Sequence, residues 1–202
     1  MDLWEIERGL AESGCESICG VDEAGRGPLA GPVFAAAVIL PFGVEIKGLN
    51  DSKKLSEKKR EELFPEIIEK ALAYGVAYAD HAEIDRLNIL NATFLAMNRA
   101  IEMLPYKPDI AIIDGNRNGG INTASICAVG GDGRSASVAA ASILAKVSRD
   151  RVMMEMALKF PSYMFDRHKG YGTKLHYEIL RACGPSEIHR KTFLRKLTYD
   201  CS

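Results

Sequence analysis

The sequence predicts an α/β protein in which five strands form a sheet flanked by helices, followed by a small helical C-terminal region. Three patterns support this fold class. Near-continuous apolar runs around 18–21, 32–40 and 110–113 have the length and composition of buried strands. Apolar residues recur at helical spacing between 84 and 104, and an alanine- and serine-rich segment at 135–160 predicts a helix that packs closely on the sheet.

The composition is that of one compact soluble domain. With 202 residues, 47% hydrophobic and 26% charged, the chain is long enough to bury a sizeable core. It begins without a cationic segment and apolar run, and no stretch reaches the roughly 20 apolar residues of a membrane span, so we expect a cytoplasmic protein. Free thiols are favoured over disulfides or a zinc site, because five scattered cysteines form no Cys-x-x-Cys pair. These are Cys15, Cys19, Cys127, Cys183 and Cys201.

Charge is distributed unevenly along the chain. The net charge is -1, but residues 161–202 contain eight Lys or Arg and only four Asp or Glu, so residues 1–160 are acidic. A basic region beside an acidic site suits a metal-dependent nuclease, because cations neutralise the acids while lysines and arginines hold the nucleic-acid backbone. A solvated helical face explains the same charges, and the sequence leaves both explanations open.

The segment 20–31, Gly-Val-Asp-Glu-Ala-Gly-Arg-Gly-Pro-Leu-Ala-Gly, is the most informative stretch of the chain. A short amphipathic helix at 3–12 precedes it and is expected to cover one end of the sheet. A strand ending at Glu23 then leads through the glycine-rich turn into the strand at 32–40, which predicts a hairpin. Because side chains alternate across a strand, Asp22 and Glu23 would face opposite sides unless the backbone bends.

The turn formed by Gly25, Arg26 and Gly27 is a candidate phosphate contact. The N–H groups of such a turn can converge on an anion, and arginine adds a fixed fork of donors. We interpret the turn and the two preceding acids as part of a metal-dependent phosphate site. An ordinary acidic hairpin turn is the alternative.

A second phosphate contact is predicted where Lys53 and Lys54 precede a helix. We expect Ser56 to be the N-cap of that helix. Amide donors, the helix dipole and two ammonium groups together favour phosphate binding. An exposed, soluble loop is the alternative.

The remaining elements complete the sheet and its helices. They are a strand at 74–79, a core-facing helix at 84–104, strands at 109–114 and 125–129, a helix at 135–160, a helix from about Lys174 and a basic helix at 186–196. The apolar stripe of the helix at 84–104 indicates core packing. Asp150 lies within the long helix, where we expect a surface ion pair and not a metal ligand.

Two further aspartates end predicted strands. Asp114 follows four apolar residues, at the carboxyl end of a strand expected to be buried on both faces, and Asp132 lies among glycines after the next strand. Each aspartate alone could cap a turn. Together with Asp22 and Glu23 they place four carboxylates at potential strand ends, which makes coincidence the weaker explanation.

Four ionised carboxylates at one sheet edge would repel one another, at roughly 4 kcal/mol per pair for a separation of about 4 Å and an effective dielectric constant near 20. Either some are protonated or cations lie among them. Oxygen ligands without Cys or His favour hard ions, so one or two Mg²⁺ or Mn²⁺ ions are expected. Two such ions about 3.5 to 4 Å apart would support phosphodiester hydrolysis without a protein nucleophile.

Loop residues add further candidate substrate contacts. Tyr171 lies between two glycines in a basic loop, which predicts an exposed stacking surface for a base or sugar. Asn116 and Arg117 extend polar side chains beyond a strand end. We do not expect His168 and His176 to bind zinc, because no acid or cysteine lies at ligand spacing.

These motifs, in this order, resemble the signatures of the ribonuclease HII family. The resemblance begins with Gly-Val-Asp-Glu-Ala-Gly-Arg-Gly-Pro-Leu-Ala-Gly-Pro-Val at 20–33 and covers nearly the whole chain. The other matching segments are Asp-Ser-Lys-Lys-Leu-Ser at 51–56, Ile-Asp-Gly-Asn at 113–116, Gly-Asp at 131–132, Ala-Ala-Ala-Ser-Ile-Leu-Ala-Lys at 139–146 and His-Lys-Gly-Tyr-Gly-Thr at 168–173. A match of this length is far more specific than an isolated glycine motif.

The resemblance implies a ribonuclease-H-like fold, with a mixed five-stranded sheet flanked by helices. It also implies an endonuclease that hydrolyses the RNA strand of RNA–DNA hybrids, including single ribonucleotides in duplex DNA, leaving 3'-hydroxyl and 5'-phosphate ends in DNA replication or repair. The catalytic, metal-binding acids would be Asp22, Glu23, Asp114 and Asp132. The backbone of the Gly25–Gly27 turn would sense the ribose 2'-hydroxyl, and Tyr171 would pack on the following sugar.

The resemblance further implies a ribonuclease-H-like catalytic part at 1–160 and a basic, helical substrate-binding region at 161–202 of the same domain. We expect a monomer that binds a hybrid or a ribonucleotide-containing duplex and no membrane. One departure is Gly130, where the family often has a lysine, so a phosphate contact there is missing or supplied elsewhere. The alternatives are a non-catalytic hybrid-binding module on the same fold and, more remotely, a DNA strand-transfer enzyme.

Overall fold

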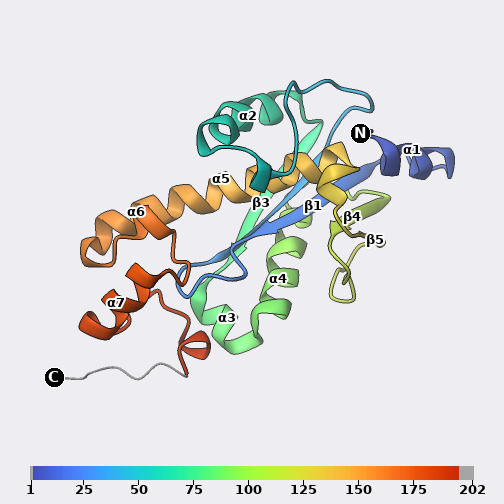
Figure 1. The fold of residues 1–202 in the computed structure, drawn as a ribbon. Coiled ribbons are helices and arrows are strands. Elements are labelled where there is room, and N and C mark those ends of the chain that lie inside the picture. Colours follow the sequence, from blue (N-terminus) through green and yellow to red (C-terminus); the bar gives the residue numbers. More distant parts are fainter. Residues whose placement is uncertain (1, 196–202) are drawn as a thin grey trace.

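The structure, a computed structural model, describes residues 2–195 and contains a five-stranded sheet (Figure 1). The strand order is β3-β2-β1-β4-β5. The strands are β1 (Ile18–Ala24), β2 (Val33–Ile39), β3 (Ala73–Ala79), β4 (Ile110–Asp114) and β5 (Ser125–Ala128). They lie where the sequence predicts them, so the α/β fold class with its five strands is confirmed.

The sheet is mixed because its strands run in both directions. β1 pairs antiparallel with β2, which confirms the predicted hairpin, and β2 pairs antiparallel with β3. β1 pairs parallel with β4, and β4 pairs parallel with β5. The carboxyl ends of β1 and β4 therefore lie at the same edge of the sheet, where acids at strand ends can meet.

Helices cover both faces of the sheet (Figure 1). They are α1 (Glu5–Glu12), α2 (Glu57–Lys70), α3 (His81–Leu87), α4 (Ile89–Glu102), α5 (Ala136–Lys159), α6 (Phe165–His168) and α7 (Lys174–Cys183). Residues 2–195 also contain four 3₁₀ turns, namely η1 (Ser52–Lys54), η2 (Gly131–Gly133), η3 (Pro161–Tyr163) and η4 (Lys191–Phe193). α5 packs on β1 and β2 with α2 beside it, and α4 packs on the opposite face.

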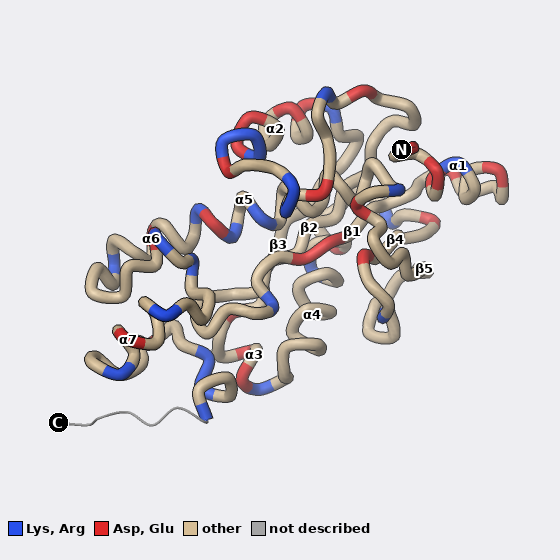
Figure 2. Tube along the Cα trace, in the orientation of Figure 1, with Lys and Arg blue, Asp and Glu red and all other residues tan. Residues whose placement is uncertain are grey.

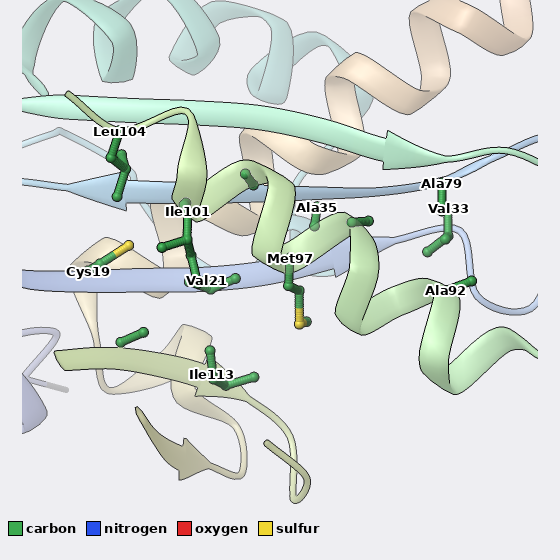
Figure 3. Packing of buried hydrophobic residues seen from close by; sticks show 14 of the residues in the cluster. Cys19, Val21, Val33, Ala35, Ala79, Ala92, Met97, Ile101, Leu104 and Ile113 are labelled. Carbon is green, nitrogen blue, oxygen red and sulfur yellow. The ribbon is translucent and has the colours of Figure 1, made fainter. Parts of the chain in front are cut away.

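Strand residues alternate between two cores. Cys19 and Val21 of β1 face α4 and cluster with Met97 and Ile101 (Figure 3). Alanines of β2 and α5 line the other core, which lets α5 lie close to the sheet. α1 packs its apolar face near β4 and β5, so the predicted cover over one end of the sheet is confirmed.

The apolar segment at 84–104 forms two helices and not the single predicted helix. α3 ends and α4 begins at Asn88, whose φ of 69° lies in the left-handed region. The Asn88 side chain accepts hydrogen bonds from the N–H groups of Leu90 and Asn91, and so caps α4. Both helices contribute to one core, so the apolar spacing continues across the break and conceals it.

The predicted basic helix at 186–196 is also wrong, because within the described part of this segment only 191–193 forms a 3₁₀ turn. The backbone of 188–190 instead lies antiparallel to 29–31, and two hydrogen bonds of 2.9 Å join the segments. These tertiary bonds use backbone groups that a helix would bond internally.

The structure also bears on membrane-spanning helices and on the cysteines. No helix of residues 2–195 combines the length and apolar character needed to span a bilayer. The described cysteines, Cys15, Cys19, Cys127 and Cys183, form no disulfide. Cys201 and Lys196 lie outside the described residues.

We expect Gly20→Ala to destabilise the protein, because a Cβ at Gly20 would lie 2.2 Å from backbone atoms of Ser137 and Val138 in α5. Neither backbone can move without separating α5 from the sheet. The free energy of unfolding should fall by about 3 kcal/mol in urea denaturation. Gly9→Ala is the control, since nothing lies within 4 Å of a Cβ at Gly9, and it should be neutral or slightly stabilising. Equal stability of the two variants would contradict the close packing of α5.

Candidate active site

Asp22 and Glu23 lie in β1 and face opposite sides of the sheet, as strand alternation predicts. Asp22 lies on the α5 face and is only 5% exposed, and its Oδ1 accepts the N–H of Glu23 at 2.7 Å. Glu23 lies on the α4 face, where its Oε1 is 3.3 Å from Nη1 of Arg26. The two acids thus extend the site around the end of β1 onto both faces.

Asp114 comes from the carboxyl end of β4, the parallel neighbour of β1. Its Oδ1 accepts the N–H of Gly131 at 2.9 Å, which holds η2 against the strand end. Gly130 precedes this turn with a φ of 66°, a conformation that glycine adopts readily. The turn carries Asp132, which is buried. One hydrogen bond therefore brings the third and fourth predicted acids together.

The acids are close enough to change one another's protonation. Burial, and then the charges of Glu23 and Asp114, raise the pKa of Asp22 well above its ordinary value. Burial also raises the pKa of Glu23. Burial, with the charges of Asp114 and Asp51, raises the pKa of Asp132 to about 6. Figure 2 shows the acidic segments of β1, of the loop before α2 and of the β4 edge near the centre of the molecule.

Asp51 and Lys53 complete this cluster, and Asp51 is absent from the predicted site residues. Asp51 caps η1, where its Oδ1 accepts the N–H of Lys53 at 2.8 Å. Burial tends to lower the pKa of Lys53, but four carboxylates outweigh it and raise that pKa. They are Asp22, Asp51, Asp132 and Asp114. The sequence signals of Asp51 are its place beside the two predicted lysines and its position at the start of the segment 51–56 that resembles the family.

The predicted pair of lysines is divided between two environments. Both lysines are exposed, but the pKa of Lys53 responds to four carboxylates, whereas Nζ of Lys54 lies 3.8 Å from Oδ2 of Asp51 alone. Ser56 caps α2 as predicted, by accepting the N–H of Lys59. The loop therefore places two exposed ammonium groups at the edge of the acid cluster.

The donor set suits a hard divalent cation, because its charged ligands are all carboxylates. In the described chain no three acidic, histidine or cysteine side chains are already arranged to hold a metal ion. Mg²⁺ fits such an open arrangement, since it keeps several waters and is commonly bound by one or two carboxylates together with substrate phosphates. The raised pKa values of Asp22, Glu23 and Asp132 indicate that positive charge there would stabilise the ionised acids.

The Gly25–Gly27 turn follows β1 directly and lies beside Glu23. Gly25 is buried with a φ of 98°, whereas Arg26 and Gly27 are exposed. The N–H groups of Arg26 and Gly27 have no acceptor within residues 2–195. The turn therefore has free amide donors next to the acids.

Tyr171 is 39% exposed, which agrees with its prediction as a loop residue outside the core. Lys146 Nζ and Arg149 Cζ lie 5.7 Å and 5.5 Å from the centre of its ring. Nδ1 of His176 lies 2.9 Å from the Tyr171 carbonyl oxygen, and His168 stacks on His176 at 4.1 Å. The ring nitrogens of both histidines are hydrogen-bonded within the protein, so the histidines support the loop.

Asn116 and Arg117 line a cavity of about 390 Å³ that adjoins the acids. Glu23, Arg26 and Asp114 line the same cavity, and apolar residues of α4 form another part of its wall. The structure thus brings the predicted polar loop to the acid cluster.

Asp150 forms the predicted ion pair, but the pair is not on the surface. Its Oδ1 lies 2.7 Å from Nζ of Lys146, and Oδ2 lies 3.9 Å from Nη2 of Arg60. Asp150 is buried where α2 packs on α5. Its position within the helix predicts the ion pair, but the burial of that pair depends on the packing of the two helices.

The chain is similar to known proteins in sequence and in fold. The family model described as ribonuclease HII matches residues 19–196. Ribonuclease HII of Caldicellulosiruptor bescii is 57% identical over 198 residues, which cover 97% of this chain and 95% of the relative. The crystal structure of ribonuclease H2 from Pyrococcus horikoshii OT3 matches with a TM-score of 0.73 and 27% identity, covering 87% of this chain and 93% of that chain. The crystal structure of Bst-RNase HIII in complex with Mn²⁺ is similar in fold alone, with a TM-score of 0.66 and 24% identity. The match covers 85% of this chain and 64% of that chain.

We expect Asp132→Asn to stabilise the metal-free protein at neutral pH. The pKa of Asp132 is about 6 in the folded protein, above the roughly 3.9 of an unfolded chain, so the folded state holds its proton to higher pH. Ionisation above about pH 6 therefore destabilises the folded state, and stability rises as the pH falls from there toward about 4. Urea denaturation in EDTA near pH 7.5 should find the variant more stable by about 1 to 3 kcal/mol, with a smaller gap near pH 4. A variant that is less stable at both pH values would contradict the repulsive cluster.

Proposed function

Because this chain belongs to the ribonuclease HII family, we propose that it is an endonuclease that hydrolyses the RNA strand of RNA–DNA hybrids. It also cuts at single ribonucleotides embedded in duplex DNA, and it leaves 3'-hydroxyl and 5'-phosphate ends. The observation that carries this proposal is the acid cluster at the ends of β1 and β4, directly beside a turn with free N–H donors. Removal of ribonucleotides during DNA replication and repair follows from this activity.

We propose that divalent cations, one or two Mg²⁺ or Mn²⁺, bind at this cluster. The ligands would be Asp22, Glu23, Asp114 and Asp132. Such ions supply the charge that activates a water for attack on phosphorus and stabilises the departing oxygen. A carboxylate-only site without a protein nucleophile suits this kind of hydrolysis.

The chain's own residues orient and hold the substrate around the acids. Lys53 places an ammonium group among the carboxylates, where it compensates their charge before substrate phosphate arrives. The exposed Lys54, Asn116 and Arg117 would contact the nucleic-acid backbone.

Recognition of RNA would come from the turn and from Tyr171. The N–H groups of Gly25–Gly27 lie beside the acids and would bond the 2'-hydroxyl, the group that distinguishes RNA from DNA. The Tyr171 ring, exposed above Lys146 and Arg149, would pack on the next sugar.

We propose that residues 1–160 carry the hydrolysis and that 161–202 help to bind substrate within the same domain. Most lysines and arginines in the described part of 161–202 are exposed, whereas Arg190 is fully buried and has another role. The proposed partner is an RNA–DNA hybrid or a ribonucleotide-containing DNA duplex, bound by a monomer in the cytoplasm.

Asp22→Asn should lower turnover by more than roughly 100-fold, beyond the loss typical of residues that only support a metal ligand. The measurement is steady-state cleavage of a DNA duplex that contains one ribonucleotide, with saturating Mg²⁺. Asp109→Asn is the matched control, because Asp109 lies at the other end of β4, where its side chain accepts the N–H groups of Glu16 and Ser17. The control should stay within about twofold of wild type. Near-normal cleavage by Asp22→Asn would exclude it as a catalytic ligand.

EDTA should abolish cleavage of the same duplex, and added Mg²⁺ or Mn²⁺ should restore it, because the acids repel without cations. Mapping the cut by gel electrophoresis should place it at the single ribonucleotide, and an all-DNA duplex should stay intact. Binding without cleavage in the presence of either metal would instead support a non-catalytic hybrid-binding module. Cleavage of the all-DNA duplex would point to a different nuclease activity.

A further inference from the structure

Two buried arginines lie beneath the turn that follows β1. Arg149 in α5 and Arg190 near the C-terminal end of the described chain are both 0% exposed. Neither forms an ion pair with a carboxylate among residues 2–195. Burial, and then the charge of Arg149, lower the pKa of Arg190 to about 9, so it stays charged at neutral pH. Their partners are backbone carbonyl groups.

Arg190 donates to three carbonyls around the turn. Its Nη2 is 2.6 Å from the Gly25 oxygen, Nη1 is 2.9 Å from the Arg26 oxygen and Nε is 2.9 Å from the Gly31 oxygen. A guanidinium group is planar and presents its donors in a fixed fork. Arg190 therefore fixes the orientation of these peptide groups relative to one another.

Covalent geometry then decides where the opposite sides of these peptides point. In a planar trans peptide the N–H points away from the preceding C=O, and the described chain contains no cis peptide. The carbonyls of Gly25 and Arg26 point toward the buried Arg190. The N–H groups of Arg26 and Gly27 consequently point away from it, which explains why both lack an acceptor in the described part of the chain.

Arg149 connects the same turn to the Tyr171 loop. Its Nε donates to the Pro32 carbonyl and its Nη2 to the Lys169 carbonyl, each at 3.0 Å. A Cβ at Gly25 would lie only 2.0 Å from Nε, so the turn packs directly on the guanidinium group. Arg149 Cζ also lies 5.5 Å from the centre of the Tyr171 ring. The turn and the ring therefore share one cationic support.

A purely structural connection would not need two unpaired buried charges, because removing such charges from water is costly and apolar side chains could fill the space. Charge has a specific use where peptide groups must be oriented. A carbonyl polarised by a cation makes the N–H of the same peptide a stronger donor.

We propose, on the premise of the function proposed above, that Arg190 is a positioning residue for recognition of the ribose 2'-hydroxyl, with Arg149 in support. Arg190 holds the N–H groups of Arg26 and Gly27 as a fixed pair of donors that face the substrate. Selectivity for RNA thus depends on a side chain that does not touch the substrate.

The test compares Arg190→Gln, Arg190→Lys and wild type as folded, metal-loaded enzymes. For each, kcat/KM is measured on a DNA duplex with one ribonucleotide, and Ki is measured for an all-DNA duplex of the same sequence as competitor. Arg190→Gln should lower kcat/KM at least about tenfold, the factor that corresponds to one lost hydrogen bond, while Ki changes less than about twofold. Arg190→Lys should lose less, because it keeps the charge but not the fork.

Two controls separate positioning from general damage. Arg99→Gln removes an arginine of α4 that donates to the Tyr78 carbonyl and to the Glu83 carboxylate and makes no hydrogen bond to the turn in the described part of the chain, and it should leave both constants unchanged. The Mg²⁺ concentration for half-maximal activity should be the same in Arg190→Gln as in wild type. A proportional loss in kcat/KM and duplex affinity, or unchanged kcat/KM in a folded Arg190→Gln, would overturn the proposal.

A second measurement needs no variant. Hydrogen exchange in wild type should be fast at the N–H groups of Arg26 and Gly27, slow when the ribonucleotide duplex binds in EDTA, and unaffected by the all-DNA duplex. Equal protection by both duplexes would contradict the positioning role. Failure of the wild type to cleave the ribonucleotide duplex with Mg²⁺ or Mn²⁺ would instead reject the proposed function, so the two failures are distinguishable.

Discussion

Repulsion among the carboxylates at the carboxyl ends of β1 and β4 is the constraint on which the rest of the site depends. Parallel pairing of these strands brings Asp114 next to Asp22, and the hydrogen bond from Gly131 to Asp114 adds Asp132. The strands cannot move apart, because they lie at the centre of a sheet with a core on each face. The folded protein therefore keeps acids together that would separate in water, and the raised pKa values of Asp22 and Asp132 reflect this energetic cost. A divalent cation bound there would relieve this repulsion, because a positive charge stabilises the ionised carboxylates.

Positive charge around the acids is arranged in two ways. Lys53 is exposed, but it lies close enough to four carboxylates to serve as their counter-charge, and their charges raise its pKa. Arg149 and Arg190 instead lie beneath the neighbouring turn and bond only to carbonyls, which leaves the amides of the turn directed outward. The net charge of -1 describes neither arrangement. Local placement of a few cations, and not an overall basic character, suits this chain to a polyanionic substrate.

The C-terminal region packs directly against the segment that follows the turn. Its backbone pairs with residues 29–31, just after the turn. His168 and His176 support the Tyr171 loop, and burial lowers the pKa of His176 to about 4, so it stays neutral. The turn, the Tyr171 ring and the acids therefore belong to one packed unit, and their spacing is set before any substrate binds.

Local sequence by itself determined the strands, the cap at Ser56, the hairpin and the four strand-end acids, because apolar runs, cap residues and glycine turns act through neighbouring residues. Tertiary structure alone decided what depends on distant partners. Asn88 divides one apolar stripe into two helices. Residues 188–190 pair with 29–31 and do not form the predicted helix. Asp51 joins the acids because η1 packs against α5. Arg190 is the clearest case. Its charge in a basic segment predicts a surface residue, yet three carbonyls more than 150 positions away hold it in the interior. Periodicity and composition carry no information about such bonds, since burial of a charge depends on which backbone groups the fold leaves unpaired.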